Sequence, residues 1–185
     1  MSSETGYRHI DHGFEPVFDA RSRVLVLGSF PSVLSRRNAF FYGNPRNRFW
    51  RVVAACVGAP VPPNEGEPVH GADPARPATL AESIEVKRRL LLDHGLALWD
   101  VVESCDIKGS SDASIRRVAP VRIERVTSAA PIERVLCNGA AAARLYDRHL
   151  RKRTGIEALA LPSTSPANAA WSLDALVARW SEALG

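Results

Sequence analysis

The stretch RVLVLGSFPS, residues 23–32, decides the fold of this chain. After Arg23, valine and leucine run without interruption to a glycine, which is the pattern of a strand buried on both faces. The serine and proline residues that follow predict a loop leaving the end of this strand. Short apolar runs typical of further strands occur at residues 96–99, 134–137 and 156–161.

Helical patterns alternate with these strands. Asn44-Pro45 is typical of an N-cap followed by proline at the first helical position, and Phe49, Trp50 and Val53 lie on one stripe of a helix that reaches residue 57. Further helices are expected at residues 80–94, after Gly139 to about residue 150, and after a Ser172 cap. Alternating strands and helices predict a three-layer α/β/α fold with a four-stranded parallel sheet.

The 185 residues suit one domain. We expect residues 23–185 to form that domain, with the proline- and glycine-rich residues 58–78 as a flexible surface loop. Residues 1–22 are expected to be either a poorly ordered segment or an edge of the fold.

Several classes of protein are excluded by what the sequence lacks. No apolar run is long enough to span a bilayer, and the N-terminus has no signal-peptide pattern, so we expect a cytoplasmic protein without membrane contact. Three separate cysteines and five dispersed histidines give no ligand spacing for a metal ion or an iron–sulfur cluster. The glycine-rich nucleotide motifs and the GxSxG elbow of acyl-transfer enzymes are absent, so no cofactor is expected.

Arginines gather where acidic residues are missing. Residues 21–64 contain seven arginines and no aspartate or glutamate, and a second basic cluster lies at residues 144–153. Such an excess is typical of a surface that docks phosphates, but also of the solvated surface of an arginine-rich protein. The charge by itself leaves both interpretations open.

Polar residues follow the expected strands and should meet in one cleft, because ligands of open α/β sheets bind beyond the carboxyl ends of the strands. These strand ends are residues 28–32, Asp100, Asn138-Gly139 and residues 162–168.

Four segments resemble the motifs of the hypoxanthine-DNA glycosylase branch of the uracil-DNA glycosylase superfamily. They are GSFPS at residues 28–32, FYGNPRNRFW at 41–50, LWDVVESCDIKGSSD at 98–112 and LPSTSPANA at 161–169. The resemblance implies a pocket for a base flipped out of DNA and hydrolysis of the N-glycosidic bond without a cofactor. Its partner would be DNA containing a deaminated base, bound by a monomer.

The resemblance also implies the catalytic residues. Many members of the superfamily place an acidic or amide residue in the first motif to position the attacking water, and Phe30 stands there. The hypoxanthine branch is similar in this respect, which makes Asn47 the catalytic residue that orients the water. Ser163 stands where the uracil enzymes have a histidine, so its hydroxyl would take over as a weaker donor.

The base would be bound by Ser29, Phe30, Phe41, Tyr42 and Asp100. A carboxylate at Asp100 accepts a hydrogen bond from N1–H of hypoxanthine but meets an acceptor at N1 of adenine, which would select the deaminated base. Phe41 or Tyr42 would stack on the flipped base. Alternatively, Asp100 caps a turn or pairs with a buried arginine, Asn47 bonds only loop backbone, and the aromatic rings belong to the core.

The DNA contacts divide into phosphate-binding and duplex-entering residues. Basic side chains of Arg36, Arg37, Arg46 and Arg48 would neutralise phosphates. The loop with Ser165, Pro166, Ala167 and Asn168 would enter the duplex, fill the gap left by the base and pinch the backbone, or it is only a turn before the last helix.

These observations predict a monofunctional glycosylase for hypoxanthine in base excision repair, since Lys108 is the only lysine in the motifs. Three alternatives remain open: the same fold acting on uracil or mismatches, a DNA-binding relative without turnover, and a hydrolase of free nucleosides.

Overall fold

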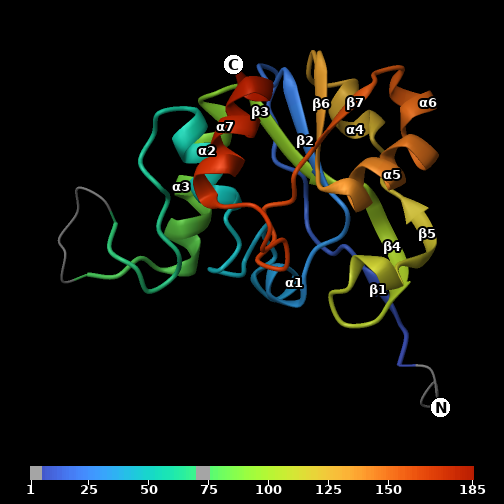
Figure 1. Ribbon diagram of the computed structural model, residues 1–185, viewed down its shortest axis with the longest axis horizontal. Helices are drawn as coiled ribbons and strands as arrows, with labels where there is room; N and C mark the ends of the chain where they lie inside the picture. Colours follow the sequence, from blue (N-terminus) through green and yellow to red (C-terminus); the bar gives the residue numbers. More distant parts are fainter. Residues whose placement is uncertain (1–5, 70–75) are drawn as a thin grey trace.

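The computed structural model describes residues 6–69 and 76–185 of the chain (Figure 1). Four parallel strands form the central sheet in the order β3-β2-β6-β7. They are β2 (Val24–Gly28), β3 (Leu96–Asp100), β6 (Arg134–Asn138) and β7 (Ala158–Leu161). The expected parallel sheet is confirmed, with each strand beginning and ending within two residues of its predicted bounds.

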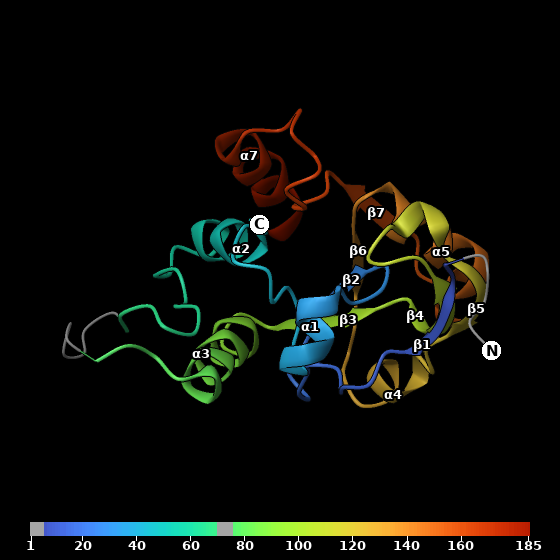
Figure 2. The same ribbon diagram turned by 90° about the horizontal axis from the view of Figure 1, so that it is seen from below.

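Helices cover both faces of this sheet (Figure 2). One side carries α2 (Phe49–Cys56), α3 (Leu80–Leu92) and α7 (Leu173–Leu184). The other side carries α4 (Glu124–Thr127) and α5 (Ala140–His149), which continues into the short α6 (Arg151–Thr154). This arrangement confirms the three-layer α/β/α fold.

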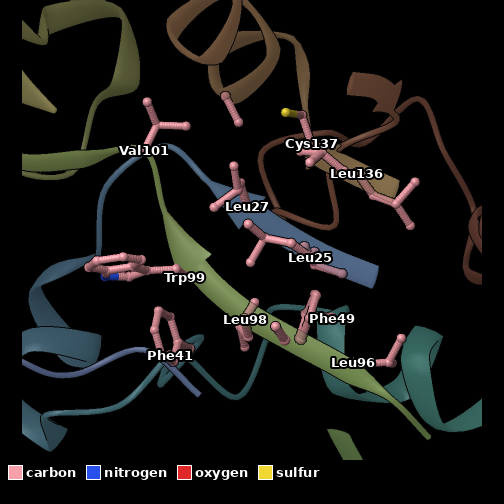
Figure 3. Packing of buried hydrophobic residues seen from close by; sticks show 14 of the residues in the cluster. Leu25, Leu27, Phe41, Phe49, Leu96, Leu98, Trp99, Val101, Leu136 and Cys137 are labelled. Atoms are coloured by element: carbon pink, nitrogen blue, oxygen red, sulfur yellow. The ribbon is translucent and has the colours of Figure 1, made fainter. Parts of the chain in front are cut away.

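The centre of the core is strand β2, whose five residues are all buried. Leu25 and Leu27 lie between residues of β3 and β6, such as Leu98 and Leu136 (Figure 3). A strand with neighbours on both edges and helices on both faces meets no water, which explains its uninterrupted apolar sequence.

A second, antiparallel sheet was not predicted. It consists of β1 (Arg8–Asp11), β4 (Val102–Ile107) and β5 (Arg116–Pro120), with β4 in the middle. Its strands are short and mostly polar, so they lack the alternation that identifies a strand, and the pairing of β4 with β5 shifts in register.

Strand β1 gives the N-terminal segment an edge position, and its continuation is packed into the domain. Val17 is fully buried and exchanges backbone hydrogen bonds with Leu98. The described part of this segment thus lies at an edge of the fold, while residues 1–5 lie outside the described residues. In the loop at 58–78, Pro68 and Pro77 form an isolated bridge, and residues 70–75 are outside the described part.

The expected start of helix α2 was wrong. Asn44 and Pro45 form a turn, closed by a hydrogen bond from the Asn47 backbone N–H to the Asn44 carbonyl, and the helix begins only at Phe49. The side-chain oxygen of Asn44 bonds the backbone of Arg46 within this turn. A short helix, α1 (Val33–Asn38), lies in the region expected to be a loop and is capped by Ser32.

Candidate functional site

A cavity of about 370 Å³ opens at the carboxyl ends of the parallel strands, a size typical of small-ligand sites. In Figure 1, α1 and the loop after β7 lie at this same end of the sheet. The cavity is lined by nine of the predicted site residues, Ser29, Phe30, Phe41, Tyr42, Asn47, Asp100, Ser163, Ser165 and Pro166. The sheet thus brings together segments that are far apart in the sequence, as the strand ends predicted.

Gly28 makes room for the acidic side chain in this cavity. A Cβ atom at position 28 would lie 2.2 Å from Oδ1 of Asp100 and 3.1 Å from the Tyr42 hydroxyl. The first distance is too short for real atoms in contact and the second is tight, so glycine allows the carboxyl group to lie against the end of β2.

Asp100 is held by a residue that the sequence did not single out. Nε2 of His12 lies 2.9 Å from Oδ2 of Asp100, and both side chains are almost completely buried. His12 follows β1, in the segment expected to be either poorly ordered or an edge of the fold, and no sequence signal connects it with a residue 88 positions away. The alternative pairing of Asp100 with a buried arginine is therefore wrong.

The hydrogen-bond partners of His12 determine where the protons of the His12–Asp100 pair lie. Nδ1 of His12 is 3.0 Å from the carbonyl oxygen of Phe14, which can only accept, so Nδ1 carries a proton. One more proton must lie between Nε2 and Oδ2, on either atom. The pair is electrically neutral in both cases, and Oδ1 remains as the carboxyl oxygen without a hydrogen bond among the described residues.

A chain of amide and hydroxyl groups lies beside the pair. Asn138 donates from Nδ2 to the Tyr42 hydroxyl and to Oγ1 of Thr164, both at 2.9 Å, and accepts from the Thr164 backbone N–H at 3.0 Å. Thr164 is fully buried. These bonds fix the orientation of the Asn138 amide and join β6 to the loop after β7.

Asn47 stands at the end of this chain of hydrogen bonds. Its Oδ1 accepts from the backbone N–H of Phe49 at 3.0 Å and from the Thr164 hydroxyl at 2.9 Å. Both lone pairs of the amide oxygen are used by these two bonds. The expectation that Asn47 orients the attacking water stays a prediction. The Nδ2 group has no acceptor among the described residues and is the part of Asn47 left for a ligand.

Tyr42 has a strained backbone in this wall of the cavity, with φ at 50°. Its ring stacks on Phe49 with centroids 4.0 Å apart, so one ring face is covered. Burial, followed by the nearby charge of Asp100, raises the pKa of the Tyr42 hydroxyl far above its ordinary value. The hydroxyl is therefore neutral at every physiological pH.

Phe41 and Phe30 form an aromatic corner around His12. Their rings lie 5.9 Å and 6.4 Å from the imidazole, and Phe14 packs at an edge-to-face angle against Phe41. Both phenylalanines are buried and still line the cavity. Which aromatic ring stacks on a base stays a prediction.

A second carboxylate, Asp112, also lines the cavity. It begins a single turn of 3₁₀ helix, η1 (Asp112–Ser114), between β4 and β5. The residue keeps contact with solvent, but partial desolvation of its carboxyl group by the surrounding protein raises its pKa, and so does the charge of Asp100, against the opposing effects of the Ser29 hydroxyl and Arg144. The third sequence motif ended on this residue, but nothing in the pattern gave it a role.

The Arg48 side chain is bound to the loop after β7. Its guanidinium donates to the carbonyls of Thr164, Ser165, Asn168 and Trp171, and its backbone N–H also bonds Thr164. Arg48 therefore holds the loop after β7, and its predicted contact with DNA stays a prediction.

Hydrogen bonds within the loop after β7 also stabilise it. Ser163 accepts from the Ser165 backbone N–H, Ser165 accepts from Ala167, and the Asn168 amide donates to the carbonyl of Ser163. Pro166 and Ala167 are exposed at its tip. A contact of these two residues with DNA stays a prediction, as does the role of Ser163.

The other arginines divide into bound and exposed groups. Arg36 donates to the carbonyl of Pro31 at 2.5 Å and lies over the Phe30 ring, so it braces the first motif. Arg37 and Arg46 are exposed and have no ion pair among the described residues. In the second basic cluster, Arg151 and Arg153 pair with Glu157 and Glu124, so this cluster is partly neutralised.

Within residues 6–69 and 76–185, no cluster of three potential metal ligands occurs. None of the helices in these ranges combines the length and apolarity needed to cross a membrane.

Comparisons with known proteins agree with the geometry. A protein named hypoxanthine DNA glycosylase from Methanosarcina acetivorans is 31% identical over 88% of this chain and 91% of its own length. One of the same name from Methanosarcina barkeri is 30% identical over 92% and 96%. A solution NMR structure of a candidate uracil DNA glycosylase from M. acetivorans has a TM-score of 0.70 and 28% identity, over 93% of this chain and 94% of that one. The profile of the uracil DNA glycosylase superfamily matches residues 15–184, and the chain therefore belongs to that superfamily.

Proposed function

We propose that this protein is a DNA glycosylase that hydrolyses the N-glycosidic bond of hypoxanthine in DNA, as the first step of base excision repair. The observation that carries this function is the Asp100 carboxyl group, which lies in a cavity between strand ends with Oδ1 available to a ligand. The names of the two Methanosarcina relatives support hypoxanthine as the base.

Selection of the base follows from the chemistry of Asp100. When Nε2 of His12 donates to Oδ2, the carboxylate is held in place and Oδ1 can accept N1–H of hypoxanthine. Adenine presents a lone pair at N1, so its binding would leave two acceptors facing each other in a buried site. A site built around such a hydrogen bond discriminates strongly against the base that lacks the donor.

Asn47 contributes to bond cleavage through its amide nitrogen in this proposal. The bonds at Oδ1 fix the amide plane, so Nδ2 is aimed without further ordering and can donate to a base that gains negative charge as it departs. The Ser163 hydroxyl also lines the cavity and would add a second donor.

The reaction stops at the abasic site. Formation of a Schiff base with the sugar requires an amine at the reacting carbon, and no lysine of the described residues lines the cavity. DNA would be bound at the cavity mouth by Arg37 and Arg46 and by the loop tip at Pro166 and Ala167. We also propose that the protein acts as a cytoplasmic monomer without a metal ion.

The direct test uses duplexes with one hypoxanthine, uracil, xanthine or adenine at the same position, followed by alkali to cut abasic sites. We expect cleavage of the hypoxanthine strand and none of the adenine strand, with no cutting before alkali. Faster cleavage of the uracil strand would make uracil the preferred base and leave the assignment of the fold unchanged. Binding without any cleavage would indicate a DNA-binding relative and contradict the proposal. Light scattering after gel filtration tests the monomer.

A further inference from the structure

Hydrolysis needs an acceptor for the proton of the attacking water, and the expected acceptors in this cavity are not available. The oxygen of Asn47 already accepts two hydrogen bonds. Phe30 stands at the first-motif position and has no polar side-chain atom. Asp100 is 5% exposed and bound to His12 through Oδ2, which suits it to grip the base and not the sugar.

Asp112 is the other carboxylate among the described residues of the cavity wall. Its residue is open to solvent, whereas Asp100 is buried, so Asp112 lies toward the mouth, where the sugar of a flipped nucleotide would remain. The loop that carries it is fastened on both sides. The Ser110 hydroxyl accepts from the backbone of Val33 at 3.2 Å, and Ser114 accepts from the backbone of Lys108 at 2.9 Å.

We infer that Asp112 is a catalytic residue, the carboxylate that takes the proton of the attacking water and stabilises the positive charge on the sugar. This inference rests on the proposed function. As the bond between C1′ and the base breaks, its electron pair leaves with the base, and the water oxygen forms the new bond to C1′. The water proton passes to Asp112 and from there through solvent to the released base, so atoms and charges balance.

The surroundings of Asp112 suit a proton acceptor. Asp100, at the end of β3, opposes its ionisation, while Arg144 of α5 and the Ser29 hydroxyl favour it. Although the residue keeps contact with solvent, partial desolvation of its carboxyl group by the surrounding protein has the largest effect and raises the pKa, which strengthens the carboxylate as a proton acceptor.

The test compares Asp112→Asn and Asp112→Glu with Asp174→Asn, a control at an exposed aspartate in the first turn of α7. Single-turnover cleavage of the hypoxanthine duplex is measured together with the Kd for a duplex carrying a stable abasic-site analogue. We expect Asp112→Asn to lose about 100-fold or more in rate, with its Kd close to that of the wild type. Asp112→Glu should recover part of the rate, and the control should match wild type.

The pH profile gives an independent readout. Below the pKa of Asp112 the carboxyl group is protonated and cannot accept, so the wild-type rate should fall as the pH is lowered, with a midpoint above the ordinary aspartate value. In Asp112→Asn this fall should disappear.

Three outcomes would overturn the inference: a rate of Asp112→Asn close to that of wild type, an equal loss of binding and rate, or an unchanged acid limb. Thermal melting of each variant shows whether it folds. If wild type cleaves another deaminated base, the same comparison is made on that base. Absence of all cleavage by wild type contradicts the proposed function, and the inference with it.

Discussion

The floor and the mouth of the cavity are built in opposite ways. On the floor, Asp100 and Thr164 are buried, and hydrogen bonds to His12, Asn138 and Asn47 fix their side chains. At the mouth, Val33 and Leu34 of α1 are 54% and 38% exposed, beside the exposed Arg37 and the exposed loop tip. A fixed floor recognises one base with little loss of entropy, whereas an exposed mouth can adapt to a DNA backbone of any sequence.

The contrast between floor and mouth is tested most severely at Asn47, whose side chain bonds Thr164 in the loop after β7. Asn47→Asp keeps both acceptor bonds but replaces the Nδ2 donor with an oxygen. If the donor acts on the leaving base, the single-turnover rate should fall about 100- to 1000-fold. The rate of Asn47→Ala should fall by as much, because alanine also lacks the donor. An Asn47→Asp enzyme faster than wild type would show that position 47 activates water after all.

The next largest effect is expected at His12. His12→Phe keeps an aromatic ring against Phe14 but leaves Asp100 without its buried partner, which should lower the unfolding free energy by about 3–5 kcal/mol. We expect the cleavage rate to fall roughly 10- to 100-fold, since each factor of ten corresponds to about 1.4 kcal/mol of weaker binding to the transition state.

His12→Gln is the matched control for this pair. Its side-chain amide can donate to Oδ2 of Asp100, so it should recover most of the rate. Equal rates for the two variants would contradict a role of the hydrogen bond, and urea unfolding of both separates folding from recognition.

Arg48→Met should act on stability more than on DNA affinity. Its side chain bonds four carbonyls of the loop after β7, and hydrogen bonds from a charged group contribute about 1.5–3 kcal/mol. We expect the Tm to fall by roughly 5–10 °C. An unchanged Tm with a reduced salt dependence of DNA binding would show that Arg48 binds a phosphate, as the sequence predicted.

The smallest effects are expected at the mouth. Arg37→Ala and Arg46→Ala remove exposed cations, so the Tm and the rate at saturating enzyme should not change. The slope of log Kd against log salt concentration should fall by about 0.9 for each phosphate that the variant no longer neutralises. Slopes equal to wild type would place the DNA elsewhere on the surface.

The sequence predicted those parts of the molecule whose cause is local. Apolar runs identify buried strands, and the end of a parallel strand is a place for ligands, so Asp100 was assigned correctly to the cavity. The second sheet was missed because β4 and β5 have no regular alternation. Asn44-Pro45 predicted a helix start, but the bonds of Asn47 to Thr164 and Phe49 hold this stretch as a turn.

Partners that meet only in the folded chain could not be predicted. His12 is an ordinary residue of an unpatterned segment until the fold brings it to Asp100. Arg48 belongs to an arginine-rich stretch. Its charge alone does not show whether its guanidinium is exposed and able to bind a phosphate or is hydrogen-bonded to carbonyls of the protein. The roles of Asn47 and Ser163 remain predictions for the same reason, because they depend on a substrate.

The bonds of residues 47 and 48 to the loop after β7 have a mechanical consequence. Asn47 binds Thr164 through its amide, and Arg48 clamps the carbonyls that follow. A strand of DNA that pushes on the loop tip therefore also displaces the backbone that carries Asn47. Under the proposed function, contact of the loop tip with the duplex and alignment of Asn47 would be one movement, and cleavage would depend on correct seating of the protein on the nucleic acid.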